Sequence, residues 1–207
     1  MKHQGFTVWF TGLPSSGKST LAFLLHRELE EIGLATAVLD GDEVRKRLTK
    51  GLGFSREDRE ENIRRIAYVA NLLTRVGAVA ITAAISPYLE MRQRARTEIG
   101  NFVEVYVHCP LQVCMQRDVK GLYAKAVRGE VLNFTGISAP YEPPANPEIT
   151  IHTECATPKE SLRQIIERLV VMNYLPEKTA GCLLKDLRDE HRPVDADAVK
   201  PNSHWAI

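Results

Sequence analysis

The sequence lacks the features that define several large classes of protein. No apolar run approaches the roughly 20 residues that a membrane-spanning helix needs. The first residues hold no long apolar segment that ends in small residues, as a secretory signal would. Only four of the 207 residues are cysteine, too few for a disulfide-rich scaffold. These absences exclude a membrane protein and a small secreted scaffold, and they predict a globular, cytoplasmic protein with reduced thiols.

The sequence also lacks an excess of charge of either sign. Its 27 Lys and Arg residues balance 26 Asp and Glu residues, which gives a formal net charge of +1. A nucleic-acid-binding domain usually carries a basic excess or a basic face. We therefore expect neither a nucleic-acid partner nor a membrane partner.

Strand and helix signals alternate along most of the chain. Runs of β-branched, aromatic or other apolar residues predict strands at 6–10, 35–39, 79–85, 103–107 and 148–152. Apolar residues recur at helical spacing in 18–32, 55–73, 88–99, 111–117 and 157–172. This order predicts a single α/β domain with a parallel β-sheet and helices on both faces.

Two segments depart from the alternation. Residues 120–147 hold several Gly and Pro residues, and a connection of this length is usually a functional lid or disordered. After Pro176 the composition changes to charged residues, Ala and Pro with little periodicity. We predict a domain over 1–176 that carries a mobile lid, and a tail or linker over 177–207 that can be partly disordered.

The strongest motif is a phosphate-binding loop. Residues 12–19, Gly-Leu-Pro-Ser-Ser-Gly-Lys-Ser, match G-x-x-x-x-G-K-[ST] between a predicted strand and a predicted helix. In such a loop, backbone N–H groups bind phosphate oxygens, Lys18 reaches the β- and γ-phosphates, and the Ser19 hydroxyl ligates Mg²⁺. The residues predicted to hold the nucleotide are Gly12, Pro14, Ser15, Ser16, Gly17, Lys18, Ser19 and Thr20.

Other features narrow the class of P-loop protein. Motors, GTPases and kinases share this loop. The sequence has no N-K-x-D segment that would read guanine, and the apolar run 79–85 leads into Ile-Ser rather than the Asp-Glu of a large ATPase. The short chain and its long Gly- and Pro-containing segment favour phosphoryl transfer to a small acceptor, because a lid excludes water.

Polar residues follow the second predicted strand, where such a sheet binds ligands. A carboxylate of Asp40 or Asp42 can hold Mg²⁺ through water or accept the proton of an attacking hydroxyl. Arg59 and Asn62 share a helix face and, with Arg45, suit an anionic acceptor that carries phosphate or sulfate. The ordinary alternatives are a turn with a helix cap at Asp42 and a salt-bridged surface.

Aromatic and metal-ligating residues form two further groups. Phe54 and Phe134 lie in Gly-containing loops, where a ring can stack on a base or simply anchor the loop. His108-Cys109 and His152 with Cys155 could converge at two strand ends. Their spacings match no zinc template, so we expect no structural metal.

The chain resembles the adenylylsulfate kinase (APS kinase) family from about Gly5 to about Tyr174. The segments that carry the resemblance are GLPSSGKST, LDGDEVR, LGFSREDREENIRRI, ISPY, KGLY and NFTGISAPYEPPANPEI. The family has a P-loop NTPase-type fold and phosphorylates the 3′-hydroxyl of adenosine 5′-phosphosulfate with ATP and Mg²⁺. The resemblance also implies a homodimer, and an association with ATP sulfurylase, to which family members occur fused.

Matched position by position, the family implies roles for individual residues. Contacts with adenylylsulfate are implied for Asp42, Arg45, Phe54, Arg59, Asn62, Ile85, Ser86, Lys120 and Phe134, and we add Asp40 beside them. The adenine would lie between Phe54 and Phe134, the lid would run from Arg117 to Phe134, and Cys155 would lie near the ATP adenine.

The catalytic residues are predicted to be Lys18, Asp42 and Ser86. Ser86 matches the serine assigned as a phosphoserine intermediate. It precedes Pro87, so an extended backbone is expected there, and no His or Lys lies beside it in sequence to act as a base. Direct transfer to the acceptor, with Ser86 gripping the acceptor, is therefore favoured.

The sequence departs from the family where Glu43 stands in place of the commoner Asn, and where Val119 stands in place of Pro. Two other interpretations stay open: a catalytically weak nucleotide-binding module, and a kinase for another small molecule.

Overall fold

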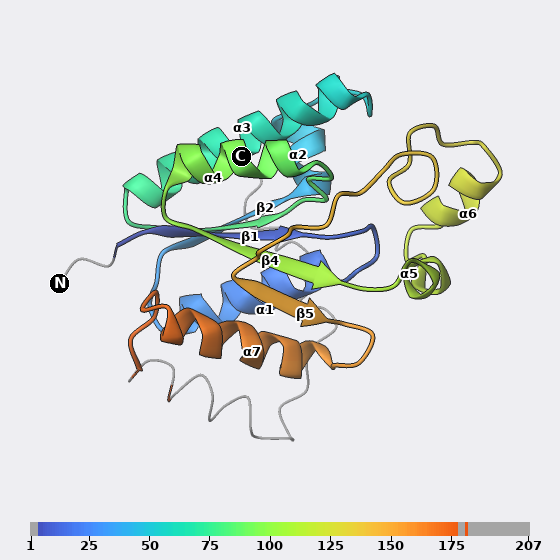
Figure 1. Cartoon of the computed structure of the whole chain (residues 1–207). Coiled ribbons are helices and arrows are strands. Elements are labelled where there is room, and N and C mark those ends of the chain that lie inside the picture. Colours follow the sequence, from blue (N-terminus) through green and yellow to red (C-terminus); the bar gives the residue numbers. More distant parts are fainter. Residues whose placement is uncertain (1–3, 178–180, 182–207) are drawn as a thin grey trace.

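Five parallel strands in the order β2-β3-β1-β4-β5 form the centre of the computed structural model (Figure 1). The structure describes residues 4–177 and 181. The strands are β1 (Phe6–Thr11), β2 (Thr36–Asp40), β3 (Val79–Ala83), β4 (Phe102–His108) and β5 (Ile149–His152). Every residue of β1 and β3 is buried, as expected for central strands covered on both faces.

Helices cover both faces of this sheet, so the predicted α/β architecture is confirmed (Figure 1). One face carries α1 (Lys18–Glu31) and α7 (Pro158–Val171), and the other carries α3 (Arg56–Arg75) and α4 (Leu89–Ile99). Each helix pair buries its own apolar core against the sheet. The first core includes Leu25 and Ile165, and the second includes Trp9 and Ile66, all of them fully buried.

Two helix starts follow from side-chain caps that the sequence contains. The Ser55 side chain accepts a hydrogen bond from the backbone N–H of Asp58 at 3.1 Å, at the start of α3. Thr157 and Glu160 form a capping box at the start of α7. Each cap satisfies N–H groups that the first turn of a helix leaves without an intrahelical partner.

Three short helices lie at or beyond the carboxyl ends of the strands: α2 (Gly41–Arg47), α5 (Leu111–Arg117) and α6 (Leu122–Val127). The apolar spacing in the sequence predicted α5, whereas α2 and α6 were not predicted. The cap of α2 is Asp40 rather than Asp42. In α6, the Asp118 carboxylate accepts from the backbone N–H groups of Tyr123 and Ala124.

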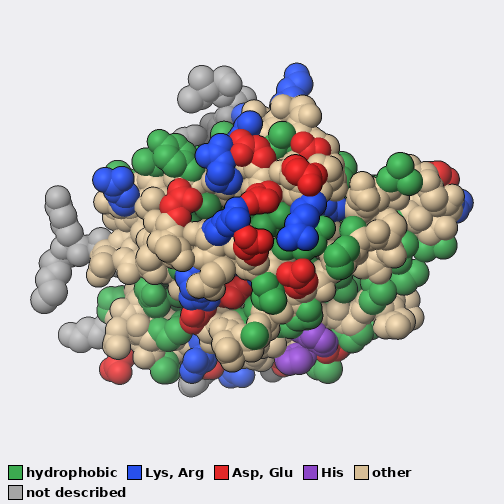
Figure 2. Space-filling view, turned by 45° about the horizontal axis from the view of Figure 1, so that its top comes forward, with side chains coloured by type: hydrophobic (Ala, Val, Ile, Leu, Met, Phe, Trp, Pro, Cys, Tyr) green, Lys and Arg blue, Asp and Glu red, His purple; other side chains and the backbone are tan. Residues whose placement is uncertain are grey.

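The surface over α3 and α4 carries both signs of charge. Figure 2 shows basic and acidic side chains interspersed there, and Arg64 with Glu61 and Arg94 with Glu90 form ion pairs on these helices. Within the part of the chain that the structure describes, no helix is long and apolar enough to cross a membrane. Apart from residues 177 and 181, the predicted tail lies outside the described residues.

Candidate active site

The loop between β1 and α1 has the backbone conformation that a phosphate cradle needs. Gly12 and Gly17 have φ angles of 151° and 104°, and Ser15 also has a positive φ of 60°. A Cβ atom at Gly12 would lie 2.5 Å from the carbonyl oxygen of Val107 on β4, so only glycine fits at that position. The loop therefore turns back sharply and leads into the N-terminus of α1.

Lys18 is buried in this loop. Its Nζ donates hydrogen bonds to the carbonyl oxygens of Gly12 at 3.0 Å and Leu13 at 2.6 Å. Burial lowers the pKa of Lys18 to about 8, although the nearby Asp40 carboxylate acts in the opposite direction. An ammonium group that has lost much of its hydration gains strongly from an anionic ligand, which fits a polyphosphate.

Ser19 and Asp40 form an oxygen pair at the phosphate end of the site. The Ser19 hydroxyl donates to Oδ2 of Asp40 at 2.6 Å, and the other Asp40 oxygen accepts from the backbone N–H of Asp42 at 3.0 Å. Hydroxyl and carboxylate oxygens are the donors that Mg²⁺ prefers, so this pair fits Mg²⁺. Asp40, predicted beside the acceptor, thus lies against the phosphate loop.

Asp42 lies one residue into α2 and points away from the core, with 57% of its side chain exposed. Its carboxylate forms an ion pair with Nζ of Lys120, which comes from the segment between α5 and α6. In the same region, the Tyr123 hydroxyl donates to the carbonyl oxygen of Pro14 at 3.0 Å. The segment predicted as a lid therefore contacts both the phosphate loop and Asp42.

Arg59 joins the two loops that hold the predicted base-stacking rings. Its Nε donates to the carbonyl oxygen of Phe54 at 2.9 Å, and its Nη1 donates to the Thr135 hydroxyl at 2.8 Å. The Phe54 ring is 52% exposed and has the Arg45 guanidinium 4.3 Å from its centroid. Phe134 is buried instead, in edge-to-face contact with Tyr123.

Arg45 and Asn62 support the loop that leads to Phe54. Arg45 donates to the carbonyl oxygen of Gly53 at 3.0 Å, and Oδ1 of Asn62 accepts from the Thr49 hydroxyl at 2.8 Å. Burial lowers the pKa values of Arg45 and Arg59, so the loop presents two partly desolvated cations. Such cations suit an anion with planar or tetrahedral oxygens.

The backbone prediction for Ser86 is wrong. Its φ is +40°, in the left-handed region, and not extended. The side chain is buried, and its Oγ accepts a hydrogen bond from Nε1 of Trp9 at 3.1 Å. The preceding carbonyl, of Ile85, accepts from the Thr11 hydroxyl at 2.8 Å. Contacts with β1 thus override the local preference of a residue before proline.

The comparisons with known proteins agree with this geometry. The family described as adenylylsulphate kinase matches residues 4–152. A protein named adenylyl-sulfate kinase from Rippkaea orientalis is 56% identical over 180 residues, covering 87% of this chain and 99% of that protein. The chain belongs to the adenylylsulphate kinase family. The predicted family is thereby confirmed.

Two other members of the adenylylsulphate kinase family extend the comparison. The APS kinase of Mycobacterium tuberculosis, solved in complex with AMPPNP and APS, has a TM-score of 0.77 and 45% identity, covering 80% of this chain and 98% of that chain. A probable bifunctional SAT/APS kinase of Sorangium cellulosum is 54% identical over 177 residues, which are 86% of this chain and 30% of that protein.

Sequence reasoning missed one buried residue in this family member, Arg92 on α4. Its guanidinium is 2% exposed and donates to the Glu104 carboxylate at 2.7 Å, the Ser86 carbonyl at 2.6 Å and the Glu142 carbonyl at 2.7 Å. A signal was available, because Glu104 interrupts an otherwise apolar strand. A buried carboxylate in a central strand requires a cation.

The loop after β5 lies beside the phosphate loop. The Thr153 hydroxyl donates to the Ser16 carbonyl at 2.9 Å, and Arg117 donates to the Thr153 carbonyl at 2.7 Å. Cys155 follows, exposed, with its backbone N–H bound to the His152 carbonyl at 3.2 Å. This places Cys155 two residues from a direct contact with the phosphate loop.

Proposed function

We propose that this chain transfers the γ-phosphoryl group of ATP to the 3′-hydroxyl of adenosine 5′-phosphosulfate, giving 3′-phosphoadenylyl sulfate and ADP. The observation that carries the proposal is the convergence of a phosphate cradle, an exposed carboxylate and a cationic, aromatic loop at one edge of the sheet. A relative that this chain matches over 99% of its length carries the name adenylyl-sulfate kinase, and the M. tuberculosis relative was solved in complex with AMPPNP and APS.

The phosphate loop would hold ATP. Residues 12–20 supply backbone N–H groups, and the Lys18 ammonium would leave its carbonyl partners to bind the β- and γ-phosphate oxygens. Ser19 and Asp40 would hold Mg²⁺, which neutralises phosphate charge when bound. The position of Cys155 supports a contact of its loop with the adenine of ATP.

The acceptor would bind on the opposite side, between α2 and α3. The exposed Phe54 ring is available to stack on adenine, while Arg45, Arg59 and Asn62 hold the loop that presents it. Phe134 would close the adenine site from the lid side. Lys120 would pass from the Asp42 carboxylate to an anionic group of the acceptor, and Asp42 would then accept the proton of the 3′-hydroxyl.

Ser86 would act by positioning the acceptor, together with Ile85, rather than by carrying a phosphoryl group. Within the described residues, the hydrogen-bond partners of its hydroxyl are the Trp9 indole and the Ala84 carbonyl, neither of which is a base. A serine nucleophile needs a base within hydrogen-bond reach. Incubation with γ-labelled ATP alone should therefore leave no label on Ser86 that transfers to adenylylsulfate at the turnover rate.

The decisive test is Asp42→Asn in a coupled assay. We expect kcat to fall by roughly 10²–10⁴, the usual contribution of a positioned base, while the fold and ATP binding are kept. Glu43→Gln is the matched control, since Glu43 is the next carboxylate on α2 and pairs with Lys46 instead. A loss below about tenfold would mean that Asp42 only positions the acceptor.

The alternatives differ in measurable ways. Rates with adenylylsulfate, AMP, shikimate and gluconate should show turnover with adenylylsulfate alone. ATP binding without turnover of any acceptor would identify a nucleotide-binding module, and preference for another acceptor would identify a different kinase.

We also propose a cytoplasmic homodimer that can associate with an ATP sulfurylase. The free cysteines Cys109, Cys114 and Cys155 support a reducing compartment. The S. cellulosum relative, named as bifunctional, supports the association. Sedimentation of the pure chain tests the homodimer, and sedimentation of the chain with a sulfurylase tests the association.

A further inference from the structure

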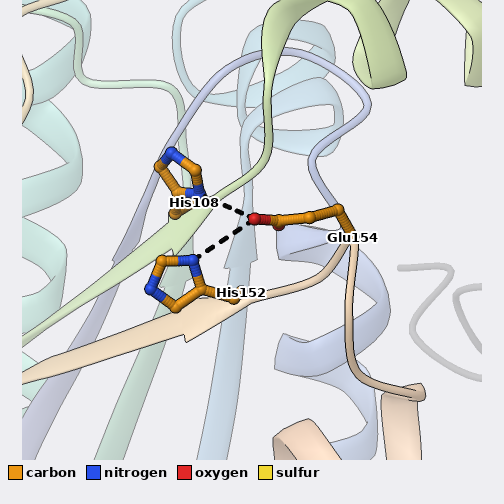
Figure 3. A group of neighbouring side chains, drawn as sticks. All are labelled: His108, His152 and Glu154. Atoms are coloured by element: carbon orange, nitrogen blue, oxygen red, sulfur yellow. Dashed lines mark hydrogen bonds and ion pairs between the residues drawn. The ribbon is translucent and has the colours of Figure 1, made fainter.

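Two histidines and one glutamate converge at the ends of β4 and β5 (Figure 3). His108 and His152 are paired across the two neighbouring strands, and their rings lie 4.8 Å apart. Glu154 follows two residues later, and its Oε1 lies 3.2 Å from Nδ1 of His108 and 3.3 Å from Nδ1 of His152. In Figure 3 both rings lie on one side of the Glu154 carboxylate, which points between them.

The distances fit the coordination sphere of a tetrahedral ion. Bonds of about 2.0 Å from Zn²⁺ to histidine nitrogen and carboxylate oxygen put neighbouring ligand atoms about 3.3 Å apart. Both nitrogen–oxygen separations already have this value. All three ligand atoms lie within 4.8 Å of one another. On binding an ion, the exposed His152 ring would turn to bring the two histidine nitrogens to the same spacing of about 3.3 Å.

One oxygen of the cluster is unsatisfied without an ion. Oε2 of Glu154 is buried and, among the residues that the structure describes, has no hydrogen-bond partner. The Nδ1 atoms of both imidazoles lie within hydrogen-bond distance of the other oxygen, Oε1. A buried carboxylate oxygen without a partner is costly. A cation that binds the carboxylate through both oxygens would satisfy Oε2 as well as Oε1.

An ion could reach the cluster and keep an open position. The His152 side chain is 57% exposed. His108 lines a cavity of about 580 Å³, whose wall also includes Tyr106, Ile137 and Tyr141. A water molecule or another small ligand could therefore complete a set of three protein ligands.

We propose that His108, His152 and Glu154 bind a divalent transition-metal ion of the Zn²⁺ class. Neutral imidazole nitrogen favours Zn²⁺, Co²⁺, Ni²⁺ or Cu²⁺ over Mg²⁺, which prefers oxygen ligands. The site is separate from the oxygen pair of Ser19 and Asp40. No structural metal was expected from the sequence, because the spacings of His108-Cys109 and of His152 with Cys155 match no zinc template. In the structure the third candidate ligand beside the two histidines is Glu154 and not a cysteine.

The ion would join β4 to the loop that follows β5. Thr153 lies between two of the ligands, and its backbone N–H donates to the His108 carbonyl at 3.2 Å. Its hydroxyl contacts the phosphate loop at Ser16. Binding of the ion to the folded chain should therefore stabilise this part of the sheet edge and raise the unfolding temperature.

The test is a titration of the full, metal-free chain with Co²⁺ and then Zn²⁺, in excess Mg²⁺ to occupy oxygen-ligand sites. We expect one Co²⁺ per chain with the intense visible d–d absorption of tetrahedral coordination, no thiolate charge-transfer band, and displacement by Zn²⁺. Calorimetry should show at least about 100-fold weaker Zn²⁺ binding for His152→Ala and for Glu154→Gln, above the 10–100-fold cost of losing a group that only orients a ligand.

Two matched variants control for other metal-binding groups. His26→Ala removes a histidine that also contacts a glutamate, Glu30, at 3.4 Å, and Cys155→Ser removes the nearby thiol. Both should keep the wild-type Co²⁺ spectrum and affinity. The proposal is overturned if no such ion binds, if binding survives His152→Ala and Glu154→Gln, or if thiolate bands appear, because the ligands would then lie elsewhere in the chain.

Discussion

Arg92→Lys tests whether Arg92 anchors the proposed acceptor site at Ser86 in addition to stabilising the fold. Lysine keeps a positive charge for Glu104, but its single nitrogen cannot also reach the carbonyls of Ser86 and Glu142 that Arg92 binds at 2.6 and 2.7 Å. Hydrogen bonds to charged groups each contribute about 1.5–3 kcal/mol. Because water or the lysine recovers part of this, we expect the free energy of unfolding to fall by about 2–4 kcal/mol.

Arg92→Lys should change the KM for adenylylsulfate but not the KM for ATP. Ser86 is held at a φ of +40°, a conformation that costs about 1–3 kcal/mol when its surroundings do not enforce it. Without the Arg92 contact, the acceptor would have to supply that energy on binding. The KM for adenylylsulfate should then rise roughly 5- to 150-fold, while the KM for ATP stays within about twofold.

Urea unfolding and a coupled kinase assay measure the two quantities. Arg96→Lys is the control, because Arg96 is buried in part and also donates to Glu104. Its other hydrogen bonds go to Glu148 and to the Phe102 carbonyl, and none goes to Ser86. That variant should lose stability without a change in either KM. The reasoning is refuted if Arg92→Lys raises both KM values equally, or if Arg96→Lys raises the KM for adenylylsulfate as much.

The remaining predictions concern the phosphate loop, the stacking ring and a helix cap. Because the pKa of Lys18 is about 8, the free enzyme loses the positive charge of Lys18 as the pH rises through that value. The kcat/KM for ATP should therefore fall around pH 8, and a profile that stays flat through this range would contradict the prediction. Phe54→Ala should raise the KM for adenylylsulfate about 5- to 150-fold, the equivalent of one stacking contact of 1–3 kcal/mol, with little effect on ATP. Thr157→Ala should lower the free energy of unfolding by about 0.5–2 kcal/mol with kcat unchanged, as measured by urea unfolding; a large loss of kcat would mean that the cap shapes the nucleotide site.

The features predicted well from sequence have local causes. Ser55 and Thr157 begin helices because their side chains accept hydrogen bonds from backbone groups three residues ahead. The phosphate loop is local too, since its glycines and Lys18 all lie within residues 12–18. The parallel sheet follows from the alternation of strands and helices, which leaves few topologies.

The features that were missed depend on contacts between distant segments. Ser86 departs from an extended backbone because Trp9 and Arg92 hold it from other elements. Glu154 joins His108 only because β4 and β5 pair in one register. The helix α6 has too few residues to give a periodic signal in the sequence. It depends on hydrogen bonds from its first turn to the Asp118 carboxylate and on burial of Tyr123.

The ion pair between Lys120 and Asp42 bears on how fast the enzyme would hydrolyse ATP when no acceptor is bound. In a kinase that holds ATP, a free carboxylate beside the γ-phosphate can act as a base for water, and the ATP is then hydrolysed. If Asp42 is the proposed base, Lys120 occupies it until an anionic acceptor draws the lysine away. Binding of the acceptor would then free Asp42 to accept the proton of the acceptor hydroxyl. While the acceptor site is empty, Lys120 would keep Asp42 occupied, and hydrolysis of ATP would be suppressed.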